Sequence, residues 1–191
     1  YAQIMQTDGT MTGEPEGILL STAAWSDQNY PKISAVNNNG NMEYYAGWSD
    51  GREMMSGTGV YAQKIAAGEI QWAEECVLVL DSDGDDTLKD IVENFYIIQN
   101  GLWNDLNIVV QKLNEDGNIA EGWPIDGLVI CDAPGNQNNP QCLMIPEGLL
   151  IVWEDYRNGD SDIYAQLMDR AGNFLWQATG VPLVQADSDQ Y

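Results

Sequence analysis

The sequence contains no histidine, few basic residues and only three cysteines. Without histidine the chain cannot build a Ser-His-Asp or Cys-His catalytic constellation, and it lacks the usual zinc ligand. None of the cysteines belongs to a CxxC motif. No apolar run approaches the roughly 20 residues that a helix needs to cross a bilayer, so direct membrane insertion is not expected.

Charge of one sign dominates the composition. Thirty acidic side chains stand against 7 basic ones, giving a formal net charge of −23. Phosphate backbones and anionic lipid surfaces repel such a chain, so nucleic acid is not an expected partner. Apolar residues nevertheless make up 44% of the sequence, with 7 Trp and 9 Tyr, which is too hydrophobic for a disordered acidic tail.

An internal repeat is the main signal in the sequence. Tyr1-Ala2-Gln3 recurs at 61–63 and 164–166, and as Val-Val-Gln at 109–111. A glycine follows each copy at a short distance, and three copies are then followed by a tryptophan. These residues are Gly9, Gly68, Gly117 and Gly172, with Trp72, Trp123 and Trp176.

A second shared block lies upstream of the first. Its residues are Trp48, Asp50 and Arg52 in one copy and Trp153, Asp155 and Arg157 in another. The middle copy has Ile98, Asn100 and Leu102 at the corresponding positions, so these residues are not required for a unit to fold.

A third shared block precedes the positions of the tryptophan, aspartate and arginine in each copy. Residues 27–31 (Asp-Gln-Asn-Tyr-Pro) match residues 136–140, and both are predicted to form a polar turn that leads into a strand. The corresponding turn of the middle copy is predicted at 81–87.

Each unit reads as four short strands. In the best-preserved copy we expect strands at 140–145, 149–154, 162–168 and 174–184, the last broken at Gly180. The runs are rich in β-branched and aromatic residues and are separated by Gly, Asn, Asp and Pro, as in all-β proteins. One helical turn is expected at Leu88–Val92.

Four antiparallel strands per repeat are typical of a β-propeller blade, and a β-sandwich is the alternative. We expect one propeller segment over residues 1–191. Its units are a partial one at 1–26, whole ones at 27–76, 85–125 and 137–184, and the start of the next at 185–191. The chain begins in a third strand and stops inside a first strand, so the propeller is expected to be incomplete.

The block from Trp153-x-Asp155-x-Arg157 through 162–166 to Asp169-x-x-Gly172 and Trp176 resembles a known repeat. It is similar to the propeller repeats of large secreted bacterial surface proteins, many of them cargo of the type IX secretion system. The resemblance implies a propeller fold and a secreted or cell-surface location. It implies little about function, because such repeats accompany adhesins, enzymes and filament components alike.

The recurring Asp50/Arg52 and Asp155/Arg157 have two interpretations. They could form a ring of ligand-facing groups, or an Arg–carboxylate clamp that holds a loop while the tryptophan packs in the core. Recurrence favours the clamp, because a unique active site has no need to repeat.

Calcium and a disulfide are further hypotheses. Asp81, Asp83 and Asp85 alternate as oxygen ligands of Ca²⁺ do, although the loop does not match an EF-hand. An ordinary solvated acidic turn is the alternative. Cys131 and Cys142 flank a turn-rich segment and could close it as a disulfide, or all three cysteines could be buried thiols.

The sequence favours a non-catalytic scaffold or interaction module of a secreted or cell-surface bacterial protein. Its expected partners are other blades of the same chain or other protein subunits. A glycan-binding propeller is the first alternative, in which aromatic residues such as Tyr44, Tyr45 and Trp103 would stack on sugars. A glycoside hydrolase on a propeller scaffold is the second, and it would need two carboxylates facing one pocket.

Overall fold

The computed structural model is built of strands and turns. It describes residues 1–5, 8–12, 16–23, 26–52, 57–102 and 105–185. Across these residues no helix is present, and hence no helix that could span a membrane. The expected all-β class is therefore confirmed.

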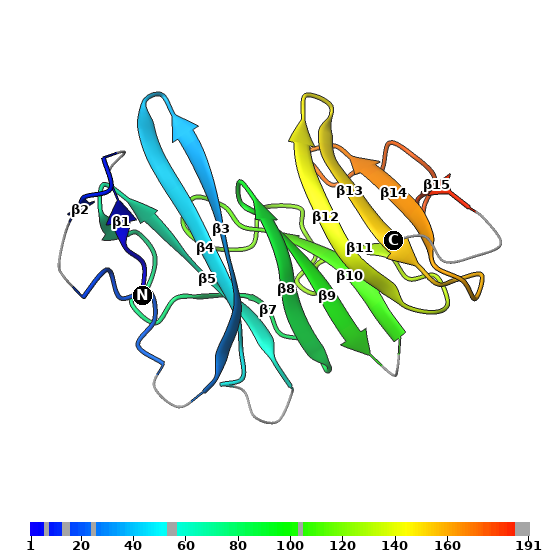
Figure 1. Ribbon diagram of the computed structural model, residues 1–191, viewed down its shortest axis with the longest axis horizontal. Coiled ribbons are helices and arrows are strands. Elements are labelled where there is room, and N and C mark those ends of the chain that lie inside the picture. Colours follow the sequence, from blue (N-terminus) through cyan, green and yellow to red (C-terminus); the bar gives the residue numbers. More distant parts are fainter. Residues whose placement is uncertain (6–7, 13–15, 24–25, 53–56, 103–104, 186–191) are drawn as a thin grey trace.

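Three antiparallel sheets follow one another along the chain (Figure 1). In each sheet, four strands lie side by side in the order in which they occur in the sequence. The first sheet contains β3 (Gln28–Asn38), β4 (Asn41–Asp50), β5 (Gly59–Ala66) and β7 (Val77–Leu80), with the short β6 (Glu69–Ile70) also paired to β5. The second contains β8 (Asp85–Val92), β9 (Phe95–Leu102), β10 (Asp105–Lys112) and β11 (Leu128–Cys131). The third contains β12 (Gln137–Ile145), β13 (Gly148–Asp155), β14 (Asp162–Met168) and β15 (Val181–Val184).

The N-terminal segment repeats part of the same pattern. β1 (Ile4–Met5) pairs with β2 (Met11–Thr12), and Ala2 forms an antiparallel bridge with Ile18. In the first sheet, Ala62 of the matching Tyr-Ala-Gln triplet pairs with Val77 in the same way. This segment therefore has the pairing of a third and a fourth strand.

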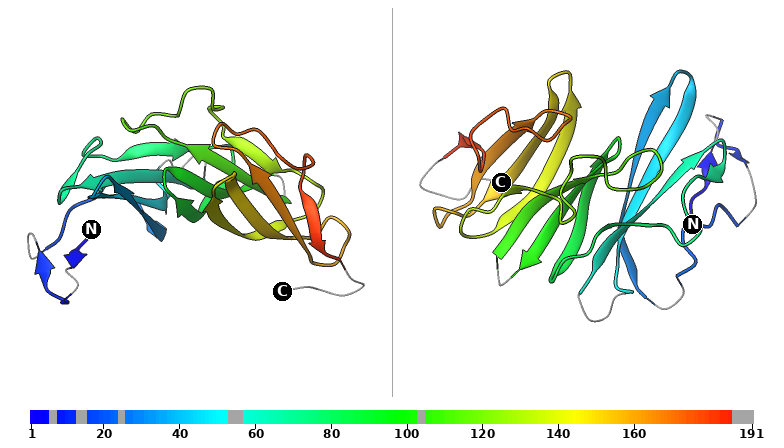
Figure 2. Two further views of the ribbon diagram at one scale, coloured as in Figure 1. Left: turned by 90° about the horizontal axis from the view of Figure 1, so that it is seen from above. Right: turned by 180° about the vertical axis from the view of Figure 1, so that it is seen from behind.

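The sheets stack on one another by their faces, and seen from above they describe an arch (Figure 2). The first strand of each sheet packs across the preceding sheet: β8 contacts β3, β4 and β5, and β12 contacts β8, β9 and β10. The second sheet consequently buries one face against the first sheet and the other against the third.

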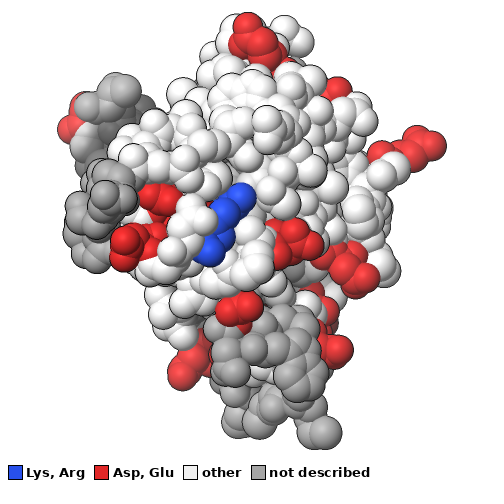
Figure 3. All heavy atoms as spheres, turned by 90° about the vertical axis from the view of Figure 1, so that its right-hand side faces the viewer, with Lys and Arg blue, Asp and Glu red and all other residues white. Residues whose placement is uncertain are grey.

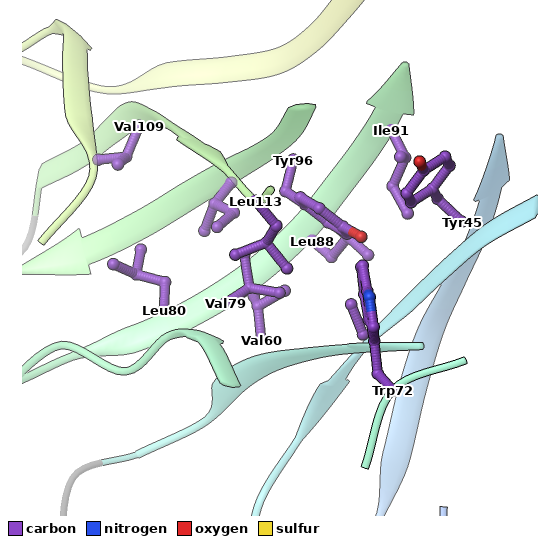
Figure 4. Packing of buried hydrophobic residues seen from close by; sticks show 12 residues of the cluster. Tyr45, Val60, Trp72, Val79, Leu80, Leu88, Ile91, Tyr96, Val109 and Leu113 are labelled. Carbon is purple, nitrogen blue, oxygen red and sulfur yellow. The ribbon is translucent and has the colours of Figure 1, made fainter. Parts of the chain in front are cut away.

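Two apolar cores fill the spaces between the sheets. The first contains Tyr45 and Trp72 of the first sheet, with ring centroids 6.0 Å apart, together with Leu88 and Tyr96 of the second (Figure 4). The second joins Phe95 and its neighbours on the second sheet to residues of the third. Those residues are Leu149, Ile151, Trp153, Tyr164 and Met168. Apolar side chains on both faces of a sheet explain the near-continuous hydrophobic runs in the sequence.

The four-stranded antiparallel units are confirmed, but several expected boundaries are wrong. The fourth strands end at Leu80 and Cys131, beyond the expected unit ends at residues 76 and 125. The expected helical turn at 88–92 lies within the strand β8, because Leu88 and Ile91 fill the first core there.

The expected polar turns at 27–31 and 136–140 lie mostly inside first strands. Gln28 pairs with Asp50 and Gln137 with Asp155, and a β-bulge follows each glutamine. The bulges place Tyr30 at φ 53° and Asn139 at φ 49°. A bulge bends a strand and redirects its side chains, and the Pro that follows cannot donate to the ladder, which fits a bulge.

Replacing Gly148 by Ala tests the tight hairpin between β12 and β13. Gly148 has φ 147°, and a Cβ there would overlap the carbonyl oxygen of Met168. The matched control is Gly122→Ala, at φ 82° with no atom within 4 Å of its Cβ. We expect the control to lose about 1 kcal/mol for the left-handed backbone, and Gly148→Ala to lose roughly 1–3 kcal/mol more. Equal losses in urea unfolding would contradict this account.

Candidate functional site

The third sheet buries an aspartate–arginine pair at the end of β13. The Asp155 side chain is fully buried. Arg157 Nε donates to its Oδ1 at 2.8 Å, and Nη2 donates to its Oδ2 at 2.6 Å. The backbone N–H of Arg157 and Nε1 of Trp153 donate to the same carboxylate at 3.0 and 2.7 Å. This fork satisfies the ionised carboxylate without water.

The other contacts of Arg157 reach three further segments. Its guanidinium carbon lies 4.0 Å from the ring centroid of Tyr164 on β14. Nη2 donates to the carbonyl oxygen of Thr179, just before β15, at 2.8 Å. It also contacts Sγ of Cys131 at 3.1 Å, and Cys131 belongs to the second sheet. The pair therefore ties three strands of its own sheet to the preceding sheet.

The first sheet repeats the arrangement at its own matching positions. Arg52 Nη2 lies 2.5 Å from Asp50 Oδ2, and Trp48 Nε1 donates to the same oxygen at 3.3 Å. The guanidinium carbon of Arg52 lies 3.8 Å from the ring centroid of Tyr61, and Nη1 donates to Glu75 O at 3.2 Å. Both expected aspartate–arginine pairs are thus present and largely buried, as a clamp requires.

The middle copy keeps a buried carboxylate but moves it to the neighbouring strand. Asp86 on β8 pairs in register with Asn100 on β9, where the other sheets pair Gln28 with Asp50 and Gln137 with Asp155. Asn100 Nδ2 donates to Asp86 Oδ1 at 2.8 Å. In the other two sheets the amide is on the first strand and the acid on the second, whereas in this sheet the acid is on the first strand and the amide on the second. Among the described residues no arginine completes this pair.

The ionisation of these acids follows their partners. Burial opposes ionisation of Asp155, but hydrogen bonds from Arg157 and Trp153 outweigh it and hold the pKa of the carboxyl below its usual range. The pKa of Asp50 is lowered in the same way, with Arg52 as the main donor. Burial raises the pKa of Asp86, because its hydrogen bonds from Asn100 and Ser82 do not compensate the lost hydration.

A glutamine in the third strand supports the same region in every sheet, and sequence analysis gave it no role. Gln63, Gln111 and Gln166 are fully buried. Their Nε2 atoms donate to backbone carbonyls in the loop before the fourth strand, at 2.9 Å (Ala73), 3.0 Å (Pro124) and 2.7 Å (Gln177). The sequence carried a signal for this role, because Gln111 is present in the middle copy, which has lost the Trp-x-Asp-x-Arg block.

Of the two interpretations of the cysteines, the structure has free thiols at all three and no disulfide between Cys131 and Cys142. Cys131 lies beside Arg157 and Asp155, and burial raises its pKa to about 11. Cys142 on β12 instead contacts Asp90 Oδ2 at 3.2 Å, and burial with that neighbouring acid raises its pKa. The two thiols therefore serve different contacts between the second and third sheets.

The loop proposed for calcium does not gather its acids. Within the described part of the chain, no group of three or more His, Cys, Asp or Glu side chains could hold a metal ion, and Asp81, Asp83 and Asp85 are described. Asp85 Oδ1 instead accepts hydrogen bonds from the backbone and hydroxyl of Thr58 at 3.3 and 3.4 Å. These contacts attach the start of β8 to the segment before β5.

The aromatic residues considered for sugar stacking have different surroundings. Tyr45 is buried in the first core, and Tyr44 is half-buried beside Ile33 and Ile65. Trp103 lies outside the described residues. A separate cavity of about 620 Å³ opens between the N-terminal segment and the first sheet. It is lined by Tyr1, Leu19, Leu20, Ser21, Thr22, Ala23, Gln28, Pro31 and Trp48.

Comparisons with known proteins add little to this geometry. No family model and no curated protein sequence matches the chain. Among solved structures it is similar to an N-acetylgalactosamine deacetylase from F. plautii, solved in complex with blood group B trisaccharide. The TM-score is 0.44 at 14% identity, over 98% of this chain and 62% of the other. So distant a likeness carries no argument about fold or function.

Replacing Arg157 by Ala tests the clamp. The change leaves the fully buried Asp155 carboxylate without its cation, so we expect a loss of roughly 3 kcal/mol or more in the free energy of unfolding. The control is Arg170→Ala, which breaks an ion pair with Glu93 in which the arginine side chain is 55% exposed. That loss should stay within about 1 kcal/mol. Similar small losses in both variants would contradict the clamp.

Asp86→Asn and Asp155→Asn should respond oppositely to pH. The pKa of Asp86 is raised in the folded state, so wild-type stability falls as pH rises through its unfolded and folded pKa values. Asp86→Asn removes that loss, and we expect it to be at least as stable as wild type at neutral pH. Asp155 contributes stability above its unfolded pKa that is lost as pH falls through the lower folded pKa. Asp155→Asn should therefore destabilise at neutral pH and matter little in strong acid.

Unfolding in urea at several pH values measures both changes. The amide introduced by Asp86→Asn can keep the contacts if the Asn100 amide and Ser82 hydroxyl reverse their roles as donors and acceptors. A loss at neutral pH as large for Asp86→Asn as for Asp155→Asn would contradict the assigned ionisation.

Proposed function

We propose that each four-stranded sheet is one blade of a β-propeller. On this proposal the chain is a non-catalytic scaffold or interaction module of a secreted or cell-surface bacterial protein. The observation that carries the proposal is that successive sheets are joined twice by contacts from the same repeat positions. Units that contact one another through the same repeat positions stack in a regular way, as in propellers and other repeat proteins.

The first of these contacts places a glycine turn against a tryptophan of the preceding sheet. A Cβ on Gly117 would lie 2.9 Å from Cδ2 of Trp72, so only glycine fits. Nε1 of Trp72 donates to the carbonyl oxygen of Glu115 in the same turn at 2.9 Å. At the next interface a Cβ on Gly172 would lie 3.5 Å from Cζ2 of Trp123.

The second contact uses the lysine that follows the repeated glutamine. Lys64 Nζ forms an ion pair with Glu115 in the turn of the second sheet. Lys112 Nζ donates to the carbonyl oxygen of Arg170 in the turn of the third sheet at 2.8 Å. One position in the repeat thus anchors the turn of the following sheet at both interfaces.

The charged residues of the repeat also support a scaffold. Asp50, Arg52, Asp155 and Arg157 neutralise one another inside the sheets, where they hold strand ends in place. The net charge of −23 favours solubility and repulsion between copies outside the cell. The resemblance of the repeat to those of secreted bacterial surface proteins supports the same location.

Electron cryomicroscopy of the protein in its native full-length form tests the blade assignment. We expect the three sheets to be arranged with others around a common axis, with β3, β8 and β12 nearest to it. Two layers packed face to face without such an axis would contradict the assignment.

Labelling and glycan binding test location and role. A membrane-impermeant amine reagent should label the protein on intact producing cells, while a cytoplasmic protein of the same cells stays unlabelled. A glycan array should show no selective binding. Selective retention of one glycan would replace the scaffold with a lectin, and labelling only after lysis would remove the surface location.

A further inference from the structure

The third sheet repeats the tryptophan site of the other two, but nothing in the described residues fills it. Trp176 follows Gln166 as Trp72 follows Gln63 and Trp123 follows Gln111. Trp72 is 8% exposed and Trp123 is half-buried, whereas Trp176 is 37% exposed. A pocket of about 510 Å³ lies beside Trp176, and it is lined by Leu175, Trp176, Gln177 and Val181.

The pocket has the same walls as the two occupied sites. Gly117 lies against Trp72 and Val77, the residue that begins β7. Gly172 lies against Trp123 and Leu128, the residue that begins β11. The pocket in the third sheet is formed by Trp176 and Val181, the residue that begins β15. A tryptophan and the first residue of the fourth strand thus form the site each time.

The rest of that sheet face is apolar as well. Leu183 on β15 is 54% exposed, whereas its counterparts Val79 and Ile130 are each 1% exposed beneath the following sheet. Val152 and Ile163 are half-buried, and their counterparts in the second sheet, Ile97 and Ile108, are fully buried. Positions that the following sheet covers at the other interfaces are thus apolar and more exposed in the third sheet.

Figure 3 views the molecule from the side of β14 and β15. Residues without charge form a broad area in the upper part of this view, whereas a cationic group with acidic groups on either side lies near its middle. This face is therefore distinguished by the pocket beside Trp176 and the exposed apolar residues of β15, not by an absence of charge.

We propose that this face of the third sheet, centred on Trp176, is a docking surface for a further four-stranded sheet of the same repeat. The incoming sheet carries an Asx-x-x-Gly hairpin turn, as at 114–117 and 169–172, and its glycine seats against the Trp176 ring. The proposal rests on the proposed function, and it adds the occupant of this face and the residue that recognises it. Continuity with the two existing interfaces identifies that occupant.

A lengthened chain provides the probe. Residues 1–189 are followed by a second copy of 137–184, which preserves the spacing between sheets, since five residues (132–136) separate β11 from β12. The added copy carries Trp176→Phe, so that only the original Trp176 is observed. Hydroxyl-radical oxidation is then measured by mass spectrometry at Trp176 and at Trp72, which is 8% exposed and serves as the internal standard for a covered ring.

We expect oxidation of Trp176 to fall several-fold in the lengthened chain, toward the low rate of Trp72. Gly172→Leu in the added copy should restore reactivity, because a Cβ at Gly172 already reaches van der Waals contact with the ring, 3.5 Å from Trp123 in the existing interface, and a longer side chain has no room. Gly159→Leu in the added copy is the matched control: Gly159 has φ 100°, close to the 91° of Gly172, but no atom within 4 Å of its Cβ. It should leave Trp176 protected.

Other outcomes overturn the docking surface. Trp176 could stay reactive while the added strands are protected from hydrogen exchange; the docking surface then fails, although the blade assignment survives. An added copy without hydrogen-exchange protection also overturns it, because a surface that accepts such a sheet must support its folding.

The 191-residue chain gives two independent checks. Trp123→Ala should lower its melting temperature, whereas Trp176→Ala should leave it unchanged; equal losses would mean that Trp176 is already engaged. Sedimentation should show no concentration-dependent dimer that protects Trp176, since such a dimer would make a second copy the occupant.

Discussion

The need of each sheet to bury two apolar faces is the constraint on which the rest of this structure depends. A single four-stranded sheet with two apolar faces cannot be stable in water, so each unit needs a neighbour on either side. The buried polar residues are arranged around this requirement. The aspartate–arginine pairs, the glutamines and the lysines all fix strand ends or turns so that the apolar faces of neighbouring sheets meet in one register.

The same constraint explains why the repeat tolerates a divergent copy. The second sheet has Ile98 and Leu102 where the other sheets have the tryptophan and arginine of the Trp-x-Asp-x-Arg block. Ile98 fills the corresponding place in the first core. What the second sheet keeps is a hydrogen-bonded polar pair in the equivalent register and a buried glutamine that attaches the loop before the fourth strand. Contacts that align a sheet are therefore retained, while the residues that make them differ.

Much of the fold could be predicted from the sequence because the repeat shows its own period. The second and third strands of the third sheet were located closely, since Tyr164 to Gln166 mark fixed points in the unit. The fourth strand was expected at 174–184, but only Val181–Val184 forms it, because Gln166 holds the loop before it through the carbonyl oxygen of Gln177. The bulges at Tyr30 and Asn139 could not be predicted, because a polar stretch before proline also fits a turn. The choice between a disulfide and free thiols could not be made, because spacing cannot show that Cys131 and Cys142 belong to different sheets and have different partners.

The exchange of Asp86 and Asn100 has a consequence for how such repeats evolve and are detected. Two positions that face each other across a strand pair share one buried site, so an acid can change strands without an intermediate that leaves the site empty. Alignment columns treat the two positions as independent and count the exchange as two losses. A search that scores paired positions jointly would count it as none, and would recover divergent units like this one.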